Sequence, residues 1–281
     1  MTDSEMEATI VGAGLNLRHL AVGYAGTTIL SDITLDLAPG GSLAIVGESG
    51  CGKTTLLRTI AGLLPPQSSA AKAIEWYRPS GEILERPHSG FVWQGLGLLP
   101  WKSVRGNLEL PLTLSASKCP KEEAHRLADK LLEELGLTGL EKRLPTQLSG
   151  GQRQRLALGR ALIARPEVLF MDEPFSALDA LRRERLQELL SNLRRRRRVT
   201  TIFVTHDIGE AAFLADRVLL LAAAPGRVLE LYDNPARHPK ARRPDGTVDR
   251  ESAAYAEALR HIHSTLRRAG SSATSPIASR D

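Results

Sequence analysis

The chain has 281 residues, of which 42% are hydrophobic and 25% charged, proportions typical of a soluble globular protein with one large domain or a domain, a subdomain and a tail. One of its two cysteines lies in a glycine-rich loop, which argues against a disulfide framework, and its longest apolar run, Val218 to Ala224, is too short to cross a bilayer. The formal net charge of +5 is concentrated in the run Arg194 to Arg198 and in residues 237–243. Such runs can bind nucleic acid or an anionic membrane, but a solvated helix end and a tail explain them more simply.

The first part of the chain is predicted to form short strands followed by one helix. Residues 1–14 are an acidic, loose leader without the apolar core of a signal peptide. Alternating apolar and polar residues over 15–46 predict strands, with turns at Gly23, Gly26 and Pro39-Gly40. Residues 53–64 then predict a helix that ends before Pro65. Residues 67–90 carry little pattern, and 91–94 predict a strand that enters a loop.

The middle of the chain predicts a helical insertion over about 96–158, which includes an amphipathic helix at 121–135 that ends at Gly136. Apolar runs then alternate with helices, a pattern typical of a mostly parallel sheet covered on both faces. The predicted strands are 168–172, 200–206 and 217–223, and the predicted helices are 181–193 and 208–215.

The chain therefore divides into a leader over 1–14, a main domain over 15–235 and a C-terminal extension over 236–281. The extension predicts one amphipathic helix at 249–268 and a disordered end at 270–281. The apolar face of that helix is formed by Tyr255, Leu259, Ile262 and Leu266. Such a helix more often packs on its own domain than on a partner.

A phosphate-binding loop is predicted where an apolar strand ends and the first helix begins. The residues follow the pattern G-x4-G-K-T in the strand–loop–helix context that the pattern requires. Glycines let backbone N–H groups point inward, and the helix N-terminus adds positive charge. A lysine can then bridge the β- and γ-phosphates, one threonine can bind Mg²⁺, and the next can lie near the α-phosphate. The residues are Gly47, Glu48, Ser49, Gly50, Cys51, Gly52, Lys53, Thr54 and Thr55.

Two adjacent carboxylates follow the predicted strand at 168–172. Because like charges repel, Asp172 and Glu173 at the end of a buried strand suggest a metal nearby. Asp172 can hold Mg²⁺ through water, and Glu173 can orient or deprotonate an attacking water. The phosphate loop and this acidic pair together predict nucleotide hydrolysis, although many hydrolases share both.

The sequence LSGGQ, from Leu148 to Gln152, limits the possible classes of nucleotide hydrolase. It is predicted to form a second helix start that can bind an anion. One chain does not need two γ-phosphate-binding sites far apart in sequence, unless the second site binds a nucleotide held by a neighbouring copy. A small-molecule kinase built on a phosphate loop leaves this sequence unexplained.

With these motifs in order, the chain resembles the ATP-binding cassette (ABC) family over roughly residues 15–235. The resemblance implies an α/β fold: a P-loop NTPase RecA-like core with a small antiparallel β-subdomain and an inserted α-helical subdomain. The supporting residues are Tyr24, the phosphate loop, Gln94, LSGGQ, MDEP (171–174), SALD (176–179) and His206.

The resemblance also implies roles for individual residues. Two cassettes close head to tail, so that each ATP contacts one phosphate loop and the other chain's Ser149, Gly150, Gly151 and Gln152. Tyr24 stacks on adenine, and Gln94 senses Mg²⁺ and water. His206 contacts the γ-phosphate, although a histidine at a strand end is otherwise often a core residue, and Asp179 couples the two sites. Cys51 fills the loop, and a thiol at a helix start is expected to have a lowered pKa.

The segment GLGLLPWKSVRGNL at 95–108 resembles the nitrate, sulfonate and taurine group of importer cassettes. This resemblance implies a peripheral subunit at the cytoplasmic face of the membrane, which drives a separate permease and depends indirectly on a periplasmic or lipid-anchored solute-binding protein. The exposed tip around Trp101 suits a partner surface, although it could cap its own lobe.

Two questions stay open at the level of sequence. The solute can be nitrate, taurine, an alkanesulfonate, bicarbonate, an aromatic acid or a pyrimidine-type thiamine precursor. A cassette that acts on nucleic acid is the weaker alternative, because those proteins usually carry two cassettes or a long coiled coil, and this chain has one set of motifs and no heptad array.

Overall fold

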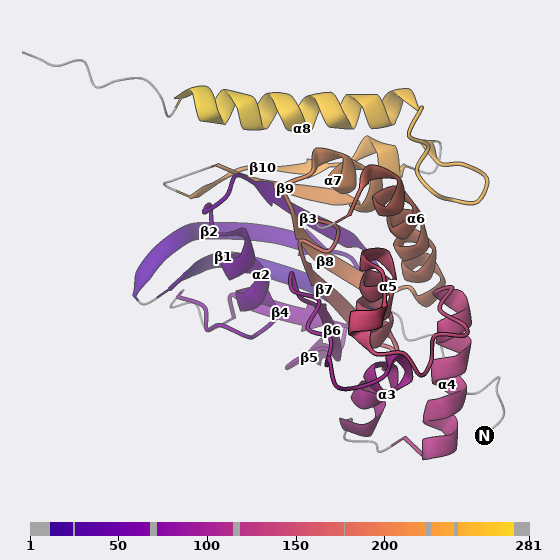
Figure 1. Ribbon diagram of the computed structural model, residues 1–281. Coiled ribbons are helices and arrows are strands. Elements are labelled where there is room, and N and C mark those ends of the chain that lie inside the picture. The colour runs from indigo at the N-terminus through magenta and orange to yellow at the C-terminus, as the bar shows by residue number, and fades with distance from the viewer. Residues whose placement is uncertain are drawn as a thin grey trace, which may run out of the picture. The chain divides into compact units, whose positions relative to one another are not determined.

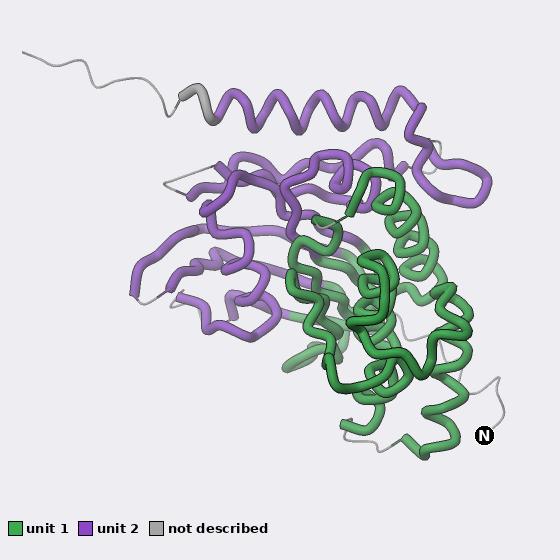
Figure 2. Tube along the Cα trace, in the orientation of Figure 1, with its two compact units in different colours: residues 1–14, 38–41, 76–202 green, residues 15–37, 42–75, 203–281 purple. Residues whose placement is uncertain are grey.

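The computed structural model describes residues 12–24, 26–67, 72–114, 119–176, 178–222, 226–238 and 241–272. Figure 1 shows its helices and strands, and Figure 2 shows the two units into which it divides. Unit 1 comprises residues 1–14, 38–41 and 76–202, and unit 2 comprises 15–37, 42–75 and 203–281. Most of the predicted leader (1–11) and of the predicted disordered end (273–281) lie outside the described residues.

In unit 2, two long antiparallel strands precede a buried parallel pair. Strands β1 (Gly14–Tyr24) and β2 (Thr27–Leu37) pair with Leu15 opposite Leu37 and Val22 opposite Leu30. Strand β3 (Ser42–Gly47) is buried along its whole length and runs parallel to β9 (Arg217–Ala222), with β10 (Arg227–Asp233) antiparallel beyond it. A strand buried on both faces requires a continuous apolar sequence, which explains the run Leu43 to Val46.

The helices of unit 2 are α2 (Lys53–Ile60), α7 (Ile208–Leu214), the short η2 (Pro235–Arg237) and α8 (Ala253–Ser272). Helix α8, in yellow in Figure 1, packs against β9, α7 and η2. Tyr255 and Ile262 of its predicted apolar face are buried, and Leu259 and Leu266 are half-buried. The helix begins at Ala253 rather than at 249, because the Ser252 hydroxyl accepts a hydrogen bond from Tyr255 N at 3.2 Å and starts the helix there.

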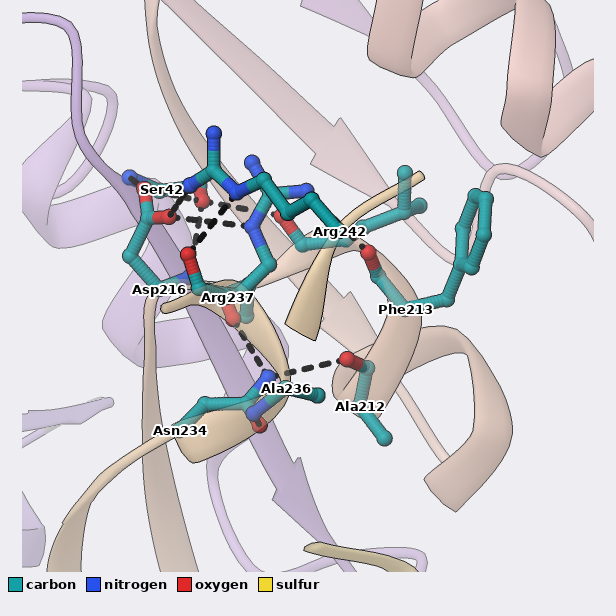
Figure 3. A network of polar contacts seen from close by, with 10 residues as sticks. Ser42, Ala212, Phe213, Asp216, Asn234, Ala236, Arg237 and Arg242 are labelled. Atoms are coloured by element: carbon teal, nitrogen blue, oxygen red, sulfur yellow. Dashed lines mark hydrogen bonds and ion pairs between the residues drawn. The ribbon is translucent and has the colours of Figure 1, made fainter. Parts of the chain in front are cut away.

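The segment after β10 is anchored through the carboxylate of Asp216 (Figure 3). Asp216 Oδ2 accepts hydrogen bonds from the backbone N–H and the hydroxyl of Ser42, each at 2.8 Å. Asp216 Oδ1 accepts one from Arg237 Nε at 3.0 Å, and Arg242 Nη2 lies 4.0 Å from the same oxygen. Because the Arg237 side chain is buried, this carboxylate fastens the start of the C-terminal extension to the starts of β9 and β3.

In unit 1, strand β7 (Val168–Asp172) is fully buried and lies between β8 (Thr200–Thr205) and β6 (Ser89–Val92), with β6 parallel to it. The last residues of β8 belong to unit 2. The short strands β4 (Ile74–Tyr77) and β5 (Ile83–Leu84) pair antiparallel. Trp76 of β4 packs edge-on against Phe170 of β7, with ring centroids 6.1 Å apart.

Helices occupy the rest of unit 1. They are α3 (Val104–Leu114), α4 (Lys121–Glu134), the short η1 (Pro145–Gln147), α5 (Gly150–Leu162) and α6 (Ala180–Arg197). Helix α3 contacts both α4 and α5, and α5 also packs on β6. Between β6 and β7 the described residues form helices and turns, and α5 continues to Leu162, beyond the 158 predicted for the end of the insertion.

Several predicted elements need correction. Gly23 lies inside β1 rather than in a turn, and α2 ends at Ile60 rather than at Leu64, because a turn begins at Ala61. Strands β4, β5 and β10 have no counterpart in the sequence prediction. Among the described residues, no helix combines the length and apolar character needed to cross a membrane.

The arginine run at the end of α6 was predicted to be a solvated helix end, and the structure shows this for only part of the run. Arg194 is only 5% exposed. Arg197 pairs with Glu134 at 2.9 Å and donates to the Leu162 carbonyl at 3.0 Å. The Arg198 carbonyl accepts a hydrogen bond from Gly12 N at 2.8 Å. Arg194 and Arg197 therefore lie against unit 1, whereas the side chains of Arg196 and Arg198 are exposed.

Candidate active site

The predicted phosphate loop connects β3 to α2 within unit 2. Lys53, the first residue of α2, is 7% exposed, and its Nζ donates hydrogen bonds to the Gly47 and Glu48 carbonyls at 2.8 and 2.7 Å. Glu48, Ser49 and Gly50 are exposed, so the outer part of the loop is open to a ligand. A buried ammonium group held under an exposed loop can attract an anion.

The backbone of the loop has the properties of a phosphate cradle. Gly50 and Gly52 have φ angles of +82° and +98°, which L side chains rarely adopt. A Cβ on Gly52 would lie 2.8 Å from Ile29 Cγ2, whereas nothing lies within 4 Å of a Cβ built on Gly50. Among the described residues, no side-chain hydrogen bond caps the start of α2 at Gly52, and backbone N–H groups at a helix start can bind a phosphate. Thr54 and Thr55, both half-buried, follow in the first turn.

Cys51 lies in this loop, but the expectation of a lowered thiol pKa is wrong. Burial raises the pKa of Cys51, and the opposing effects of Lys53 and of backbone N–H groups do not offset it. The residue is 1% exposed. A raised pKa and burial together make Cys51 a packing residue that reacts slowly.

We therefore expect iodoacetamide to label Cys119 before Cys51 in the folded protein. Burial raises the pKa of both thiols, but Cys119 is only half-buried. Both rates are expected to increase as the pH rises, because only the thiolate reacts. Timed alkylation followed by peptide mass analysis measures each site, and a Cys119→Ser variant isolates Cys51. Faster labelling of Cys51 than of Cys119 at pH 7 would contradict this assignment.

The acidic pair lies at the end of β7 in unit 1. Asp172 is the last residue of the strand and is 2% exposed, and Glu173 follows it half-buried. Gln94 Nε2 donates a hydrogen bond to Glu173 Oε2 at 3.2 Å. The structure therefore brings together two residues, 79 positions apart, that the sequence analysis assigned to the attacking water. A carboxylate with an amide at this distance can accept a proton from a water held between them.

The LSGGQ sequence forms the start of α5, also in unit 1. Ser149 is its N-cap: the hydroxyl accepts a hydrogen bond from Gln152 N, and Gln152 Oε1 accepts one from Ser149 N at 2.9 Å. This reciprocal capping box holds the helix start in place. Ser149 is exposed, Gly150 is half-buried and Gly151 is buried, so this helix start is presented at the surface.

Three further predicted residues lie at the surface. Tyr24 ends β1 in unit 2 and is 69% exposed, as a residue that stacks on a ligand requires. His206 follows β8 and is exposed, so it is not a core histidine. Asp179 is the N-cap of α6 in unit 1, where its carboxylate accepts a hydrogen bond from Arg182 N at 3.0 Å. Neighbouring Ala177 of the SALD sequence lies outside the described residues.

Two side chains near Glu173 and Gln94 were missed by the sequence analysis. Arg160 of α5 donates hydrogen bonds to the carbonyls of Gly97 and Leu96, at 2.5 and 3.3 Å, and so holds the loop after Gln94. Gln154, buried on the same helix, donates to the Pro174 carbonyl. The available signal for Gln154 was a glutamine among the core-facing positions of a helix, where an apolar residue is expected.

Comparisons with known proteins identify the family to which these motifs belong. The family model described as ABC transporter matches residues 30–176. The taurine import ATP-binding protein TauB of Escherichia coli strain K12 is 44% identical over 218 residues, which cover 77% of this chain and 82% of the relative. TauB of Shigella flexneri is 43% identical over the same shares.

Solved structures give the same family. The dimeric bacterial ABC transporter cassette MJ0796 matches with a TM-score of 0.65 and 30% identity, over 78% of this chain and 98% of that chain. Its post-hydrolysis dimer bound to ADP and Pi matches with a TM-score of 0.64 and 29% identity, over the same shares. The predicted α/β P-loop NTPase fold is therefore confirmed, and the chain belongs to the ABC transporter family of ATP-binding cassettes.

Proposed function

We propose that this chain is the ATP-hydrolysing subunit of an importer for a small anion such as taurine, another sulfonate or nitrate. The observation that carries the proposal is the presence of two separate anion-binding helix starts in one chain, at α2 and α5, together with the Gln94–Glu173 pair. The relatives named as taurine import ATP-binding proteins support the solute class. Bicarbonate, an aromatic acid and a thiamine precursor are the alternative solutes.

The proposed nucleotide site is completed only when two copies pair. In each site, one chain supplies Tyr24 for the adenine and Lys53 and Thr55 for the phosphates. The other chain supplies the α5 start, from Ser149 to Gln152. The exposure of Tyr24 and Ser149 is consistent with this pairing. The MJ0796 cassette is itself dimeric, which supports a second cassette as partner.

A magnesium ion is proposed to accompany ATP. The hydroxyl of Thr54, the amide oxygen of Gln94 and the carboxylate of Asp172 are all hard oxygen ligands, which suit Mg²⁺. The ion would supply neutralisation of phosphate charge. Glu173 then orients or deprotonates water, His206 contacts the γ-phosphate, and Asp179 couples the two sites.

The proposed transport partners are membrane permease subunits at the cytoplasmic face, with a periplasmic or lipid-anchored solute-binding protein acting through them. The nucleotide-binding domain is proposed to span 15–235, with the extension over 236–281. Two features of unit 1 suit a permease segment. Trp101 is 73% exposed, and a cavity of about 500 Å³ is lined by Phe91, Pro111, Leu114 and Arg160 among others. Nucleic acid is not a proposed partner, because this chain carries one set of cassette motifs and no heptad array.

Replacing Trp101 with alanine is expected to weaken association with the permease about tenfold or more, because buried tryptophans often dominate interfaces. ATP binding should change less than twofold, because the phosphate-loop residues are untouched. Co-purification of tagged permease from membranes, beside nucleotide binding to the isolated subunit, measures both. Ile83→Ala is the matched control, since Ile83 is another exposed apolar side chain of unit 1. Equal permease recovery with both variants would remove Trp101 from the interface, and failure to recover any permease would contradict the proposed function.

A further inference from the structure

Gln154 of α5 makes a contact for which the proposed mechanism so far has no use. It lies five positions after Ser149, is 5% exposed, and its Nε2 donates a hydrogen bond to the carbonyl of Pro174. Pro174 directly follows Glu173 and is itself buried. One buried side chain therefore connects the helix that begins at LSGGQ to the backbone immediately after the proposed general base.

The backbone at Glu173 needs support from its surroundings. Its φ angle is +48°, in the left-handed region that non-glycine residues rarely adopt, and the residue before a proline normally has an extended conformation. Such a conformation persists only where neighbouring contacts hold it. On one side, the Ser176 hydroxyl donates to the Glu173 carbonyl at 3.1 Å, and Gln94 holds the carboxylate at 3.2 Å. On the other side, Gln154 holds the Pro174 carbonyl.

The cost of keeping a glutamine at this position indicates that its amide donor has a use. The Oε1 atom of Gln154 is buried and has no hydrogen-bond partner within the described ranges of the chain. A methionine or leucine would fill similar space without burying an unpaired oxygen. The Pro174 carbonyl, however, would then lose a buried donor. Gln154 therefore leaves its Oε1 atom unpaired among the described residues, while its Nε2 atom satisfies and fixes the Pro174 carbonyl.

We propose that Gln154 is a positioning residue, which couples engagement of the α5 start to the placement of Glu173 in the same chain. The inference rests on the proposed function, in which Ser149 binds the partner's ATP and Glu173 acts on the chain's own. Helix α5 is continuous from Gly150 to Leu162, so a shift of its start would move Gln154 with it. Binding at one nucleotide site thereby adjusts the general base of the other.

The test replaces Gln154 with methionine, which keeps length and bulk but removes the donor. We expect kcat for ATP hydrolysis to fall roughly 10- to 100-fold, as misplacement of a reacting group does. The KM for ATP and ATP-dependent dimerisation, the latter measured in a Glu173→Gln background, should change less than about twofold. Gln187→Met is the matched control, because Gln187 is a buried glutamine of α6 in the same unit. It should keep kcat within about twofold of wild type.

A second measurement separates positioning from general destabilisation. Because Gln154 acts through Glu173, adding Gln154→Met to Glu173→Gln should not lower the residual hydrolysis further. Gln154→Asn, which keeps the amide but withdraws it by one methylene, should also lower kcat, and it serves if the methionine variant does not fold. Wild-type kcat in a folded Gln154 variant, or an equal loss of kcat in Gln187→Met, would overturn the inference. Full hydrolysis by Glu173→Gln would remove Glu173 as the base and the inference with it, whereas the proposed function is tested separately by recovery of the permease.

Discussion

Replacing Glu173 with glutamine is expected to reduce ATP hydrolysis about 10²- to 10⁴-fold, the range that a general base contributes. Glutamine has nearly the same shape and can still lie beside Gln94, but it cannot accept a proton from water. ATP binding should persist, because Lys53 and the loop that follows β3 are unchanged. Phosphate release at saturating ATP measures the hydrolysis, and size-exclusion chromatography with ATP should show a longer-lived dimer.

Glu184→Gln provides the matched control, because Glu184 is an exposed carboxylate on α6. Its replacement removes the same charge from the same unit. Its hydrolysis rate should stay within about twofold of wild type. If Glu173→Gln hydrolysed ATP as fast as Glu184→Gln, the carboxylate that Gln94 contacts would not be the base.

Replacing Ser149 with aspartate is expected to abolish ATP-dependent dimerisation and hydrolysis. Aspartate caps a helix as well as serine does, so α5 should keep its start. The added carboxylate would face the γ-phosphate of the partner's ATP. Two like charges about 4 Å apart near a protein surface repel by roughly 4 kcal/mol, which corresponds to about a thousandfold loss of affinity. Analytical ultracentrifugation with ATP, in a Glu173→Gln background, measures the dimer.

Ser149→Asn separates charge from shape, because asparagine also caps well and is nearly the size of aspartate but neutral. This variant should retain measurable dimerisation, and both variants should bind nucleotide as single copies through the phosphate loop. Equal dimerisation by the aspartate and asparagine variants would show that Ser149 does not face a phosphate, and the head-to-tail pairing would have to be abandoned.

Strands were predicted correctly from the sequence where their own residues carried the pattern, and were missed where their formation depends on distant partners. Strand β7 was predicted with its observed bounds, because an unbroken apolar run ends at an acidic pair. Strands β4 and β5 are short, and their pairing depends on partners elsewhere in the fold, such as Phe170 against Trp76. Strand β10 has half-buried positions along most of its length, so its residues lack a clear alternation.

The same distinction applies to the candidate site. Motif spacing was sufficient to predict the phosphate loop, because a loop that binds through its backbone requires glycines at set positions. The role of Gln94 followed only from the family resemblance, which did not predict its hydrogen bond to Glu173. The contact of Gln154 with Pro174 depends on how α5 packs. For Cys51, the helix start was visible in the sequence, but the burial that raises its pKa was not.

The carboxylate of Asp216 has a consequence for where this protein can be cut or joined. The last recognised motif is at His206, so a fragment that stops after β10 would still contain every family motif. Such a fragment would lack the guanidinium groups of Arg237 and Arg242, and the acid beside Ser42 would lose its positive neighbours from that segment. The polypeptide just beyond Asp233 is therefore attached to unit 2 through Asp216, and grafting another cassette's tail at that junction would require a replacement arginine.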